Sequence, residues 1–196
     1  MAVVMVALLL CLLSGCGMGT SFCASKQDEQ RPSADTARKI LIVYYSRSGD
    51  TRELAQVIQE NVGGDLLELQ TVEPYPKEDE KIAEQAKPEI TQGIKAILKP
   101  IIYDVKDYDL IFVGYPIWRG TIAPPVTSFL IQNDFTNKTL IPFCTHGGNG
   151  EVNSVSDIQK LLPRALVLNG FAANGSNVEN EKQNIINWLS KIQIGE

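Results

Sequence analysis

The most constraining feature of the sequence is the abrupt change of character within residues 40–53. An apolar run over residues 40–45 stops at hydroxyl residues and a glycine, and a helical pattern of apolar residues begins at once. This order predicts a strand, a tight loop and a helix N-terminus in direct succession. The first N–H groups of a helix lack intrahelical partners, and the helix dipole adds partial positive charge there. The loop is therefore predicted to bind a small anion such as phosphate.

Side chains of the same loop agree with that prediction. Ser46, Ser48 and Thr51 can donate hydroxyl hydrogen bonds, and Gly49 lets the backbone approach a bound group closely. A polar turn with a helix cap, as any α/β protein has, remains the alternative. The loop has neither the Gly-Lys-Ser/Thr of a Walker loop nor the three glycines of the dinucleotide fingerprint.

Three segments, in this order, resemble loops of the flavodoxin family. Residues 46–51 are similar to the family's phosphate loop, hydroxyl-x-Thr-Gly-x-Thr, with Ser48 where threonine is usual. Residues 114–120 follow a predicted strand and resemble the loop that lies against the flavin ring. Residues 145–150 follow another strand and resemble the second loop that contacts the ring. The Pro-x-Trp loop followed by Ala-Pro-Pro at 123–125 is similar to the small flavodoxin-like proteins.

Strand and helix patterns alternate over the part of the chain that the resemblance covers, residues 38–196. This alternation predicts an α/β domain with helices on both faces of a doubly wound, five-stranded parallel sheet. The flavodoxin resemblance implies the strand order 2-1-3-4-5 and a ligand outside the carboxyl ends of strands one and three. A helix broken near Pro88 is expected within residues 73–100. The five strands are expected at residues 40–45, 65–70, 110–114, 140–145 and 164–169.

The resemblance implies FMN as the cofactor. Residues 46–51 are expected at its phosphate, residues 116–120 at its ring, and the 145–150 loop at its pyrimidine edge and ribityl chain. The expected cofactor-binding residues are Ser46, Arg47, Ser48, Gly49, Asp50, Thr51, Pro116, Ile117, Trp118, Arg119, Gly120, Thr145, His146, Gly147, Gly148 and Gly150.

Four of these residues carry individual expectations. Trp118 is expected to be the flat platform for the ring, with a purely core role as the alternative. Arg119 stands where many relatives have a second aromatic residue, and its charge would favour the anionic reduced flavin. Asp50 is expected to face solvent, because a carboxylate repels phosphate. His146, the only histidine, is a weak candidate for proton delivery, with a hydrogen-bonded loop histidine as the alternative.

The charge and the cysteine and histidine content of the chain argue against nucleic-acid binding and against a metal site. The net charge is −5 and no basic cluster is present, so nucleic acid is not an expected partner. The cysteine and histidine spacing suggests no metal site. Cys144 is expected to be a small core residue, although a disulfide with Cys23 is possible in an oxidising compartment.

The N-terminal residues predict export and lipidation. Residues 1–15 have the apolar run of a signal peptide, and Leu-Ser-Gly-Cys at 13–16 resembles a bacterial lipobox. Cys16 would carry the lipid, palmitate included, and residues 16–37 would be a tether at the extracytoplasmic side of the bacterial cell membrane. Residues 1–3 lack the usual lysine or arginine, and an N-terminal strand or core helix is the alternative.

Three functions are compatible with these observations. The first is FMN-dependent electron transfer to a redox partner protein. The second is an enzyme, an FMN-dependent reductase of quinones or other small acceptors. The third, which the intact loop at residues 46–51 disfavours, is a surface binding module that has lost its cofactor.

Overall fold

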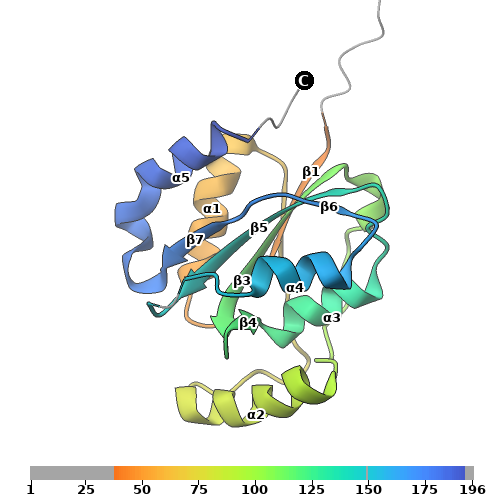
Figure 1. Cartoon of the computed structure of the whole chain (residues 1–196), viewed down its shortest axis with the longest axis vertical. Helices are drawn as coiled ribbons and strands as arrows, with labels where there is room; N and C mark the ends of the chain where they lie inside the picture. The colour runs from red at the N-terminus through yellow and green to blue at the C-terminus, as the bar shows by residue number, and fades with distance from the viewer. Residues whose placement is uncertain (1–37, 149, 193–196) are drawn as a thin grey trace, which may run out of the picture. The chain divides into compact units, whose positions relative to one another are not determined.

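A central sheet organises the computed structural model, which describes residues 38–148 and 150–192 (Figure 1). Its hydrogen-bonded strand order is β2-β1-β3-β5-β6, with all these pairs parallel. In addition, β4 pairs antiparallel with β3, and β7 pairs parallel with β5. The α/β class with a flavodoxin-like sheet is confirmed. The strands are β1 Ile40–Tyr44, β2 Asp65–Glu68, β3 Leu110–Trp118, β4 Thr121–Ile122, β5 Thr139–His146, β6 Leu166–Val167 and β7 Phe171–Asn174.

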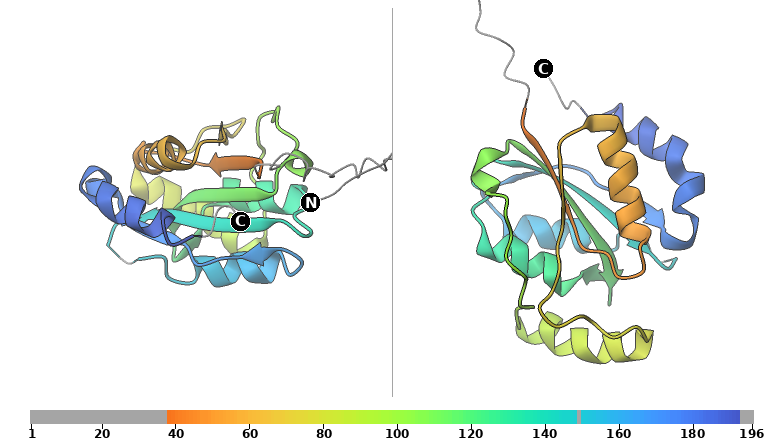
Figure 2. Two further views of the ribbon diagram at one scale, coloured as in Figure 1. Left: turned by 90° about the horizontal axis from the view of Figure 1, so that it is seen from above. Right: turned by 180° about the vertical axis from the view of Figure 1, so that it is seen from behind.

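Helices cover both faces of this sheet. Figure 2 shows α1 and α5 on one side and α3 and α4 on the other. The strand period of two explains the layers: Ile40 and Ile42 face the first helix pair, whereas Leu41 and Val43 face the second. Both faces are therefore buried, and β1 is apolar at every position. The helices are α1 Asp50–Val62, α2 Asp79–Gln92, α3 Pro124–Gln132, α4 Ser154–Leu161 and α5 Lys182–Leu189, with short 3₁₀ segments η1 Val105–Asp107 and η2 Gly175–Glu181.

The third strand is longer than the sequence pattern predicts. β3 continues past Gly114 to Trp118 and turns at Arg119 and Gly120 into β4. Both turn residues have positive φ, 50° and 81°, which is typical of a two-residue hairpin. The expected ring loop is thus a hydrogen-bonded hairpin, because the proline-containing end of β3 gains partners from β4 and β5.

The fifth strand is divided instead of continuous. β6 has two residues, and β7 lies beyond residues 164–169, where the fifth strand was expected. Both segments pair with β5, and the Leu168 N–H still donates to the Leu140 carbonyl, 2.9 Å away. Phe-Ala-Ala-Asn has no clear strand pattern, so its pairing with β5 decides its conformation.

Helix α2 runs through Pro88, so the expectation of a helix broken near this residue was wrong. The proline removes one hydrogen bond, to the carbonyl of Glu84, and Glu84 is an exposed residue. Ile82 and Ala86, on the opposite side of α2, are buried. Tertiary packing of this face outweighs the local cost of the proline. The helix lies beyond the carboxyl ends of the strands, at the bottom of Figure 1.

Cys144 is a free thiol in the core of β5, as its interpretation as a core residue predicted. It is 1 % exposed, and burial raises the pKa of its thiol to about 12. In a chain starting at residue 38 it is the only cysteine. Ellman's reagent at pH 8 is expected to leave it unmodified in the native protein and to modify it fully in 6 M guanidinium. Fast modification of the native chain would contradict the burial.

The raised pKa of Cys144 also predicts a pH dependence of stability. Between the ordinary thiol pKa, near 9.0, and about 12, the unfolded chain loses this proton while the folded chain keeps it. Because the folded state then binds more protons, the free energy of unfolding decreases with pH in this window and is unaffected below it. Urea titrations at pH 8, 9.5 and 10.5 should show a steeper decline for the parent chain than for Cys144→Ala. Parallel declines would contradict the assignment.

Several expectations lie outside the described residues: the signal peptide, Cys16, the tether and Cys23. Among the described helices, none is long and apolar enough to cross a membrane.

Candidate functional site

A cavity of about 450 Å³ opens at the carboxyl ends of β1, β3, β5 and β7. The three segments that the sequence analysis selected all reach its wall, although they lie far apart in the chain. This is the edge of a doubly wound sheet where ligands bind. The predicted residues that line the cavity are Arg47, Ser48, Asp50, Pro116, Ile117, Trp118, Arg119, Thr145, His146 and Gly147.

The N-terminus of α1 forms one end of this site. Gly49 occupies the cap position with φ of 112°, and no described side chain caps the helix. The Ser46 hydroxyl turns back within the loop and accepts the Gly49 N–H at 3.2 Å. The first-turn N–H groups of a 13-residue helix therefore remain available to an anion.

Two buried hydroxyls join the loop after β1 to the end of β5. The Thr51 and Thr145 side-chain oxygens are 2.8 Å apart, and the residues are 1 % and 4 % exposed. Their hydrogen bond holds the first and third predicted loops at a set separation. Thr51 thus lies behind the cavity wall, whereas Thr145 is part of the wall.

Removing one of these hydroxyls should destabilise the fold. Thr51→Val leaves the Thr145 hydroxyl buried without its partner, and we expect the free energy of unfolding to fall by about 1–2 kcal/mol. Thr145→Val should have a similar effect, and the double variant should cost less than the sum of the two. A urea-denaturation double-mutant cycle measures this coupling. Strict additivity would show that the hydroxyls do not interact.

Both charged residues of the phosphate-type loop make hydrogen bonds within the protein. Asp50 lines the cavity, accepts a hydrogen bond from the Ser48 hydroxyl at 2.7 Å, and lies against Gly175. Asp50 is half-buried instead of fully exposed to solvent, because the turn after β7 approaches the loop. Arg47 donates to the Lys77 carbonyl at 2.7 Å, which ties the loop to the segment before α2.

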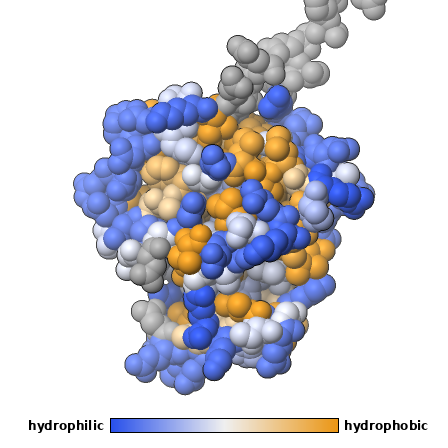
Figure 3. All heavy atoms as spheres, viewed as in Figure 1, coloured by the Kyte–Doolittle hydropathy of each residue, from blue (hydrophilic) through white to orange (hydrophobic). Residues whose placement is uncertain are grey.

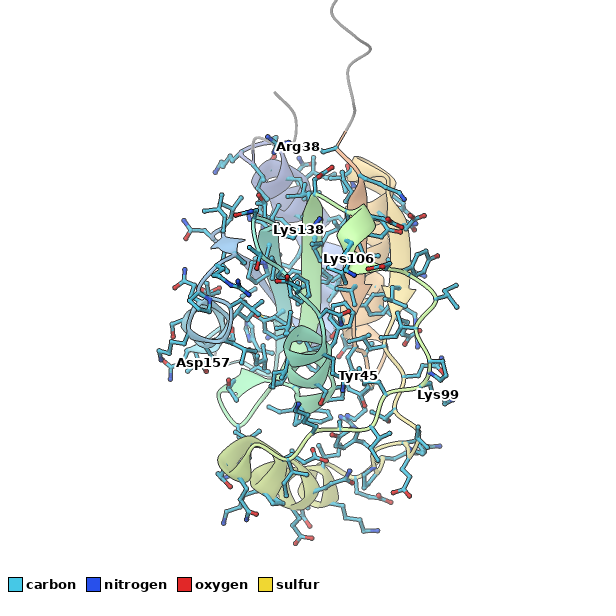
Figure 4. The ribbon with its side chains drawn as sticks, turned by 90° about the vertical axis from the view of Figure 1, so that its right-hand side faces the viewer. Arg38, Tyr45, Lys99, Lys106, Lys138 and Asp157 are labelled. Carbon is cyan, nitrogen blue, oxygen red and sulfur yellow. The ribbon has the colours of Figure 1, made fainter. Side chains whose placement is uncertain are left out.

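One aromatic side chain, Trp118, lines another wall and packs against two tyrosines. The Trp118 ring lies 4.8 Å from the Tyr75 ring and 5.7 Å from the Tyr45 ring, both edge-on. Tyr45, at the α2 end of β1 (Figure 4), is buried, and burial raises its pKa to about 12. The Tyr75 hydroxyl donates to Glu89 at 2.6 Å. Trp118 therefore packs against the core and also lines the cavity, and its role as a platform for the ring stays a prediction.

The His146 ring is held by its own loop. Its Nδ1 accepts the Gly148 N–H at 3.0 Å, so the neutral ring carries its proton on Nε2. The residue is partly exposed and lines the cavity. His146 is therefore both hydrogen-bonded within its loop and accessible from the cavity.

Some predicted residues lie off the wall, and others on it were missed. Gly120 lines a neighbouring cavity instead. The missed residues come from α2, from the last residue of β7 and from the turn after it. The glycines at 170 and 175 were the available signal for the last two. The predicted residues that do not line the cavity are Ser46, Gly49, Thr51, Gly120, Gly148 and Gly150. The residues that line the cavity but were not predicted are Ile82, Ala83, Ala86, Asn174, Gly175 and Ser176.

Comparisons with solved structures give similar chains. A Bacteroides uniformis protein described as a flavoprotein is 26% identical, with a TM-score of 0.71, covering 79% of this chain and 99% of its own. A second flavoprotein, from Bacteroides eggerthii, is 26% identical with a TM-score of 0.65, and the match covers 76% of this chain and 98% of that protein. A Lactobacillus acidophilus flavoprotein in complex with FMN is 27% identical, with a TM-score of 0.61, covering 74% and 98%.

Comparison with curated protein sequences gives no significant match. A family profile described as Flavodoxin matches residues 39–192, which span all of the described helices and strands. This match shows, in agreement with the sheet order and the cavity at the strand ends, that the chain belongs to the flavodoxin family.

Proposed function

We propose that this protein binds FMN in the cavity at the carboxyl ends of β1, β3 and β5 and acts in electron transfer. One observation carries the proposal: a single cavity joins an uncapped helix N-terminus, a partly buried tryptophan and a hydrogen-bonding loop. These are the environments that a phosphate, a flat ring and its polar edge require. The FMN complex of the similar Lactobacillus acidophilus flavoprotein supports the proposal.

The donor set fits the phosphate of FMN. The N–H groups at the start of α1 and the Ser48 hydroxyl lie at one end of the cavity. The Asp50 carboxylate would oppose an anion, but it already accepts the Ser48 hydroxyl and lies against Gly175. Neutral and positive donors therefore remain for the phosphate.

The opposite end fits the ring. Trp118 and Pro116 line the cavity from β3, and Ala83 and Ala86 line it from α2. Small side chains on α2 leave room for a flat group between the helix and the hairpin. FMN supplies the redox chemistry when bound, whereas these residues position the ring and keep water from part of it.

Two polar residues are suited to adjust the proton and charge balance at the ring. His146 lines the cavity, and its proton is on Nε2 because Nδ1 accepts the Gly148 N–H. Arg119 adds a positive charge at the tip of the hairpin. A positive charge there favours the anionic reduced form of a flavin over the neutral one.

A reductase of quinones or other small acceptors is the second candidate. Two observations favour it over a protein-to-protein carrier: the net charge of −5 is modest, and Arg119 stands at the cavity. Carriers that dock on basic partners benefit from a stronger acidic field. A cofactor-free binding module is the third candidate, and the uncapped start of α1 at the cavity argues against it.

We further propose that Cys16 anchors the protein to the extracytoplasmic side of a bacterial membrane. The lipobox-like residues 13–16 support this placement. Mass spectrometry of the membrane-extracted protein should find a diacylglyceryl and acyl modification on Cys16. An unmodified N-terminus retaining residues 1–15 would contradict it.

The visible absorption spectrum of the purified chain from residue 38 onward tests the main proposal. We expect the visible absorption of an oxidised flavin and release of FMN on denaturation. A colourless protein that does not bind added FMN would overturn both flavin-dependent candidates. If FMN is bound, oxidation of NADH or NADPH in the presence of a quinone would identify a reductase, and no oxidation would identify a carrier.

A further inference from the structure

A second cavity, of about 420 Å³, lies beside the proposed FMN site and is separated from it by the β3–β4 hairpin. It is bounded by α2, β4, α3 and α4, and we call it the α2–α3 cavity. Its size is typical of small-molecule sites. Figure 3 shows apolar atoms between α2, at the bottom, and the helices above it. The neighbouring cavity shares only Arg119 with this one.

The walls of the α2–α3 cavity are largely aliphatic. Each bounding element supplies at least one branched side chain, and Ile131 on α3 is 42 % exposed. Covering such a wall with an apolar ligand removes aliphatic surface from water and therefore favours binding. The aliphatic wall residues are Ile90, Ile94, Ile122, Ile131 and Leu161.

A hydroxyl without a partner lines the same cavity. Ser128 on α3 is 1 % exposed, and its hydroxyl makes no hydrogen bond within the described part of the chain. No described side-chain oxygen or nitrogen is both sealed from solvent and unpartnered. The Ser128 hydroxyl therefore reaches the cavity space. A buried hydroxyl in this position favours a ligand that accepts its hydrogen bond.

The charged groups of the wall balance one another. Glu89 accepts the Tyr75 hydroxyl at 2.6 Å, and Asp157 on α4 (Figure 4) accepts the Thr121 hydroxyl at 2.6 Å. Lys95 and Arg119 supply two positive charges against these two carboxylates. A lining of zero net charge with its carboxylates already hydrogen-bonded selects no ion.

From the aliphatic wall, the free Ser128 hydroxyl and the balanced charge, we propose that the α2–α3 cavity binds small uncharged ring compounds that carry a carbonyl group. The ring covers the isoleucine and leucine side chains, and the carbonyl oxygen accepts the Ser128 O–H. This site is distinct from the proposed FMN site, and its existence does not depend on FMN.

Fluorine NMR of the full chain with 4′-fluoroacetophenone tests the proposal, with 4-fluorotoluene as the matched compound without a carbonyl. We expect the ketone to bind with a Kd of about a millimolar, which is ordinary for a ligand of this size. Ser128→Ala should weaken ketone binding about fivefold, the contribution of one neutral hydrogen bond. The same substitution should leave 4-fluorotoluene binding unchanged.

Two further variants locate the compound. Thr127→Trp projects a large side chain into the α2–α3 cavity and should abolish binding of both compounds. Gln132→Trp, on the same helix but off this wall, should not. Equal ketone binding by wild type and Ser128→Ala, or binding unaffected by Thr127→Trp, would overturn the proposal, as would no binding to wild type.

Saturation with FMN separates this proposal from the previous one. We expect the ketone to stay bound when FMN is added to the same sample. Displacement by FMN would place the ketone in the FMN cavity and overturn the second site. Failure of FMN to bind, with ketone binding intact, would count against the proposed function alone.

Discussion

Trp118→Ala is expected to weaken FMN binding about 30-fold. The indole ring is the largest side chain on the cavity wall, and removing it takes away apolar contact worth about 2 kcal/mol. The substitution also removes the edge-on contacts with Tyr45 and Tyr75, so the wall itself becomes less well defined. Titration of the apoprotein with FMN, followed by quenching of flavin fluorescence, measures the loss.

The second tryptophan of the chain provides the matched control. Trp188, on α5, packs against Phe112 and Phe171 on the opposite face of the sheet. Trp188→Phe should leave FMN affinity within about twofold, and Trp118→Phe should retain most of it because a flat ring remains. Unfolding of each apoprotein in urea separates lost stability from lost affinity. Unchanged FMN affinity in Trp118→Ala would place the flavin elsewhere.

Gly114→Ala should lower the free energy of unfolding by about 3 kcal/mol, through overpacking in the centre of the sheet. A Cβ at this position would lie 2.2 Å from the Phe143 ring and 2.8 Å from the Tyr44 Cβ. Phe143 is fully buried, so its ring cannot move aside without displacing other core atoms. β3 pairs at Gly114 with both β1 and β5, and a shift of the strand would disturb both ladders.

Gly147→Ala is the control for this effect. Gly147 lies in the loop after β5, and a Cβ there meets no atom within 4 Å. We expect calorimetry to show a melting temperature lower by about 10 °C for Gly114→Ala and nearly unchanged for Gly147→Ala. Equal melting temperatures for the two variants would show that the core around Phe143 is looser than the structure indicates.

Much of the fold was predictable because its signals are local. The apolar run before Ser46 marks a strand buried on both faces, and Gly49 with the helical pattern after it marks the start of α1. Strand–helix alternation then implies a parallel sheet, and a parallel sheet implies a ligand edge. The three predicted loops meet at that edge and line one cavity.

The predictions of secondary structure that were wrong involve contacts between segments instead of local signals. β3 extends to Trp118 because β4 and β5 offer hydrogen-bond partners, and β7 forms on β5 despite an indistinct sequence. Helix α2 tolerates Pro88 because Ile82 and Ala86 are buried against the rest of the domain. In each case a contact between segments distant in sequence outweighs local propensity.

The sequence by itself determined the class of fold, the edge at which the site lies and the three loops that build it, because hydrophobic periodicity and turn residues act over a few positions. Only the tertiary structure decided that Asp50 lies against Gly175 and that α2 covers the cavity with Ala83 and Ala86. It also brought Thr51 to Thr145 and left the Ser128 hydroxyl facing a second cavity. These features depend on how separate segments pack, and packing distances are not encoded in any one segment.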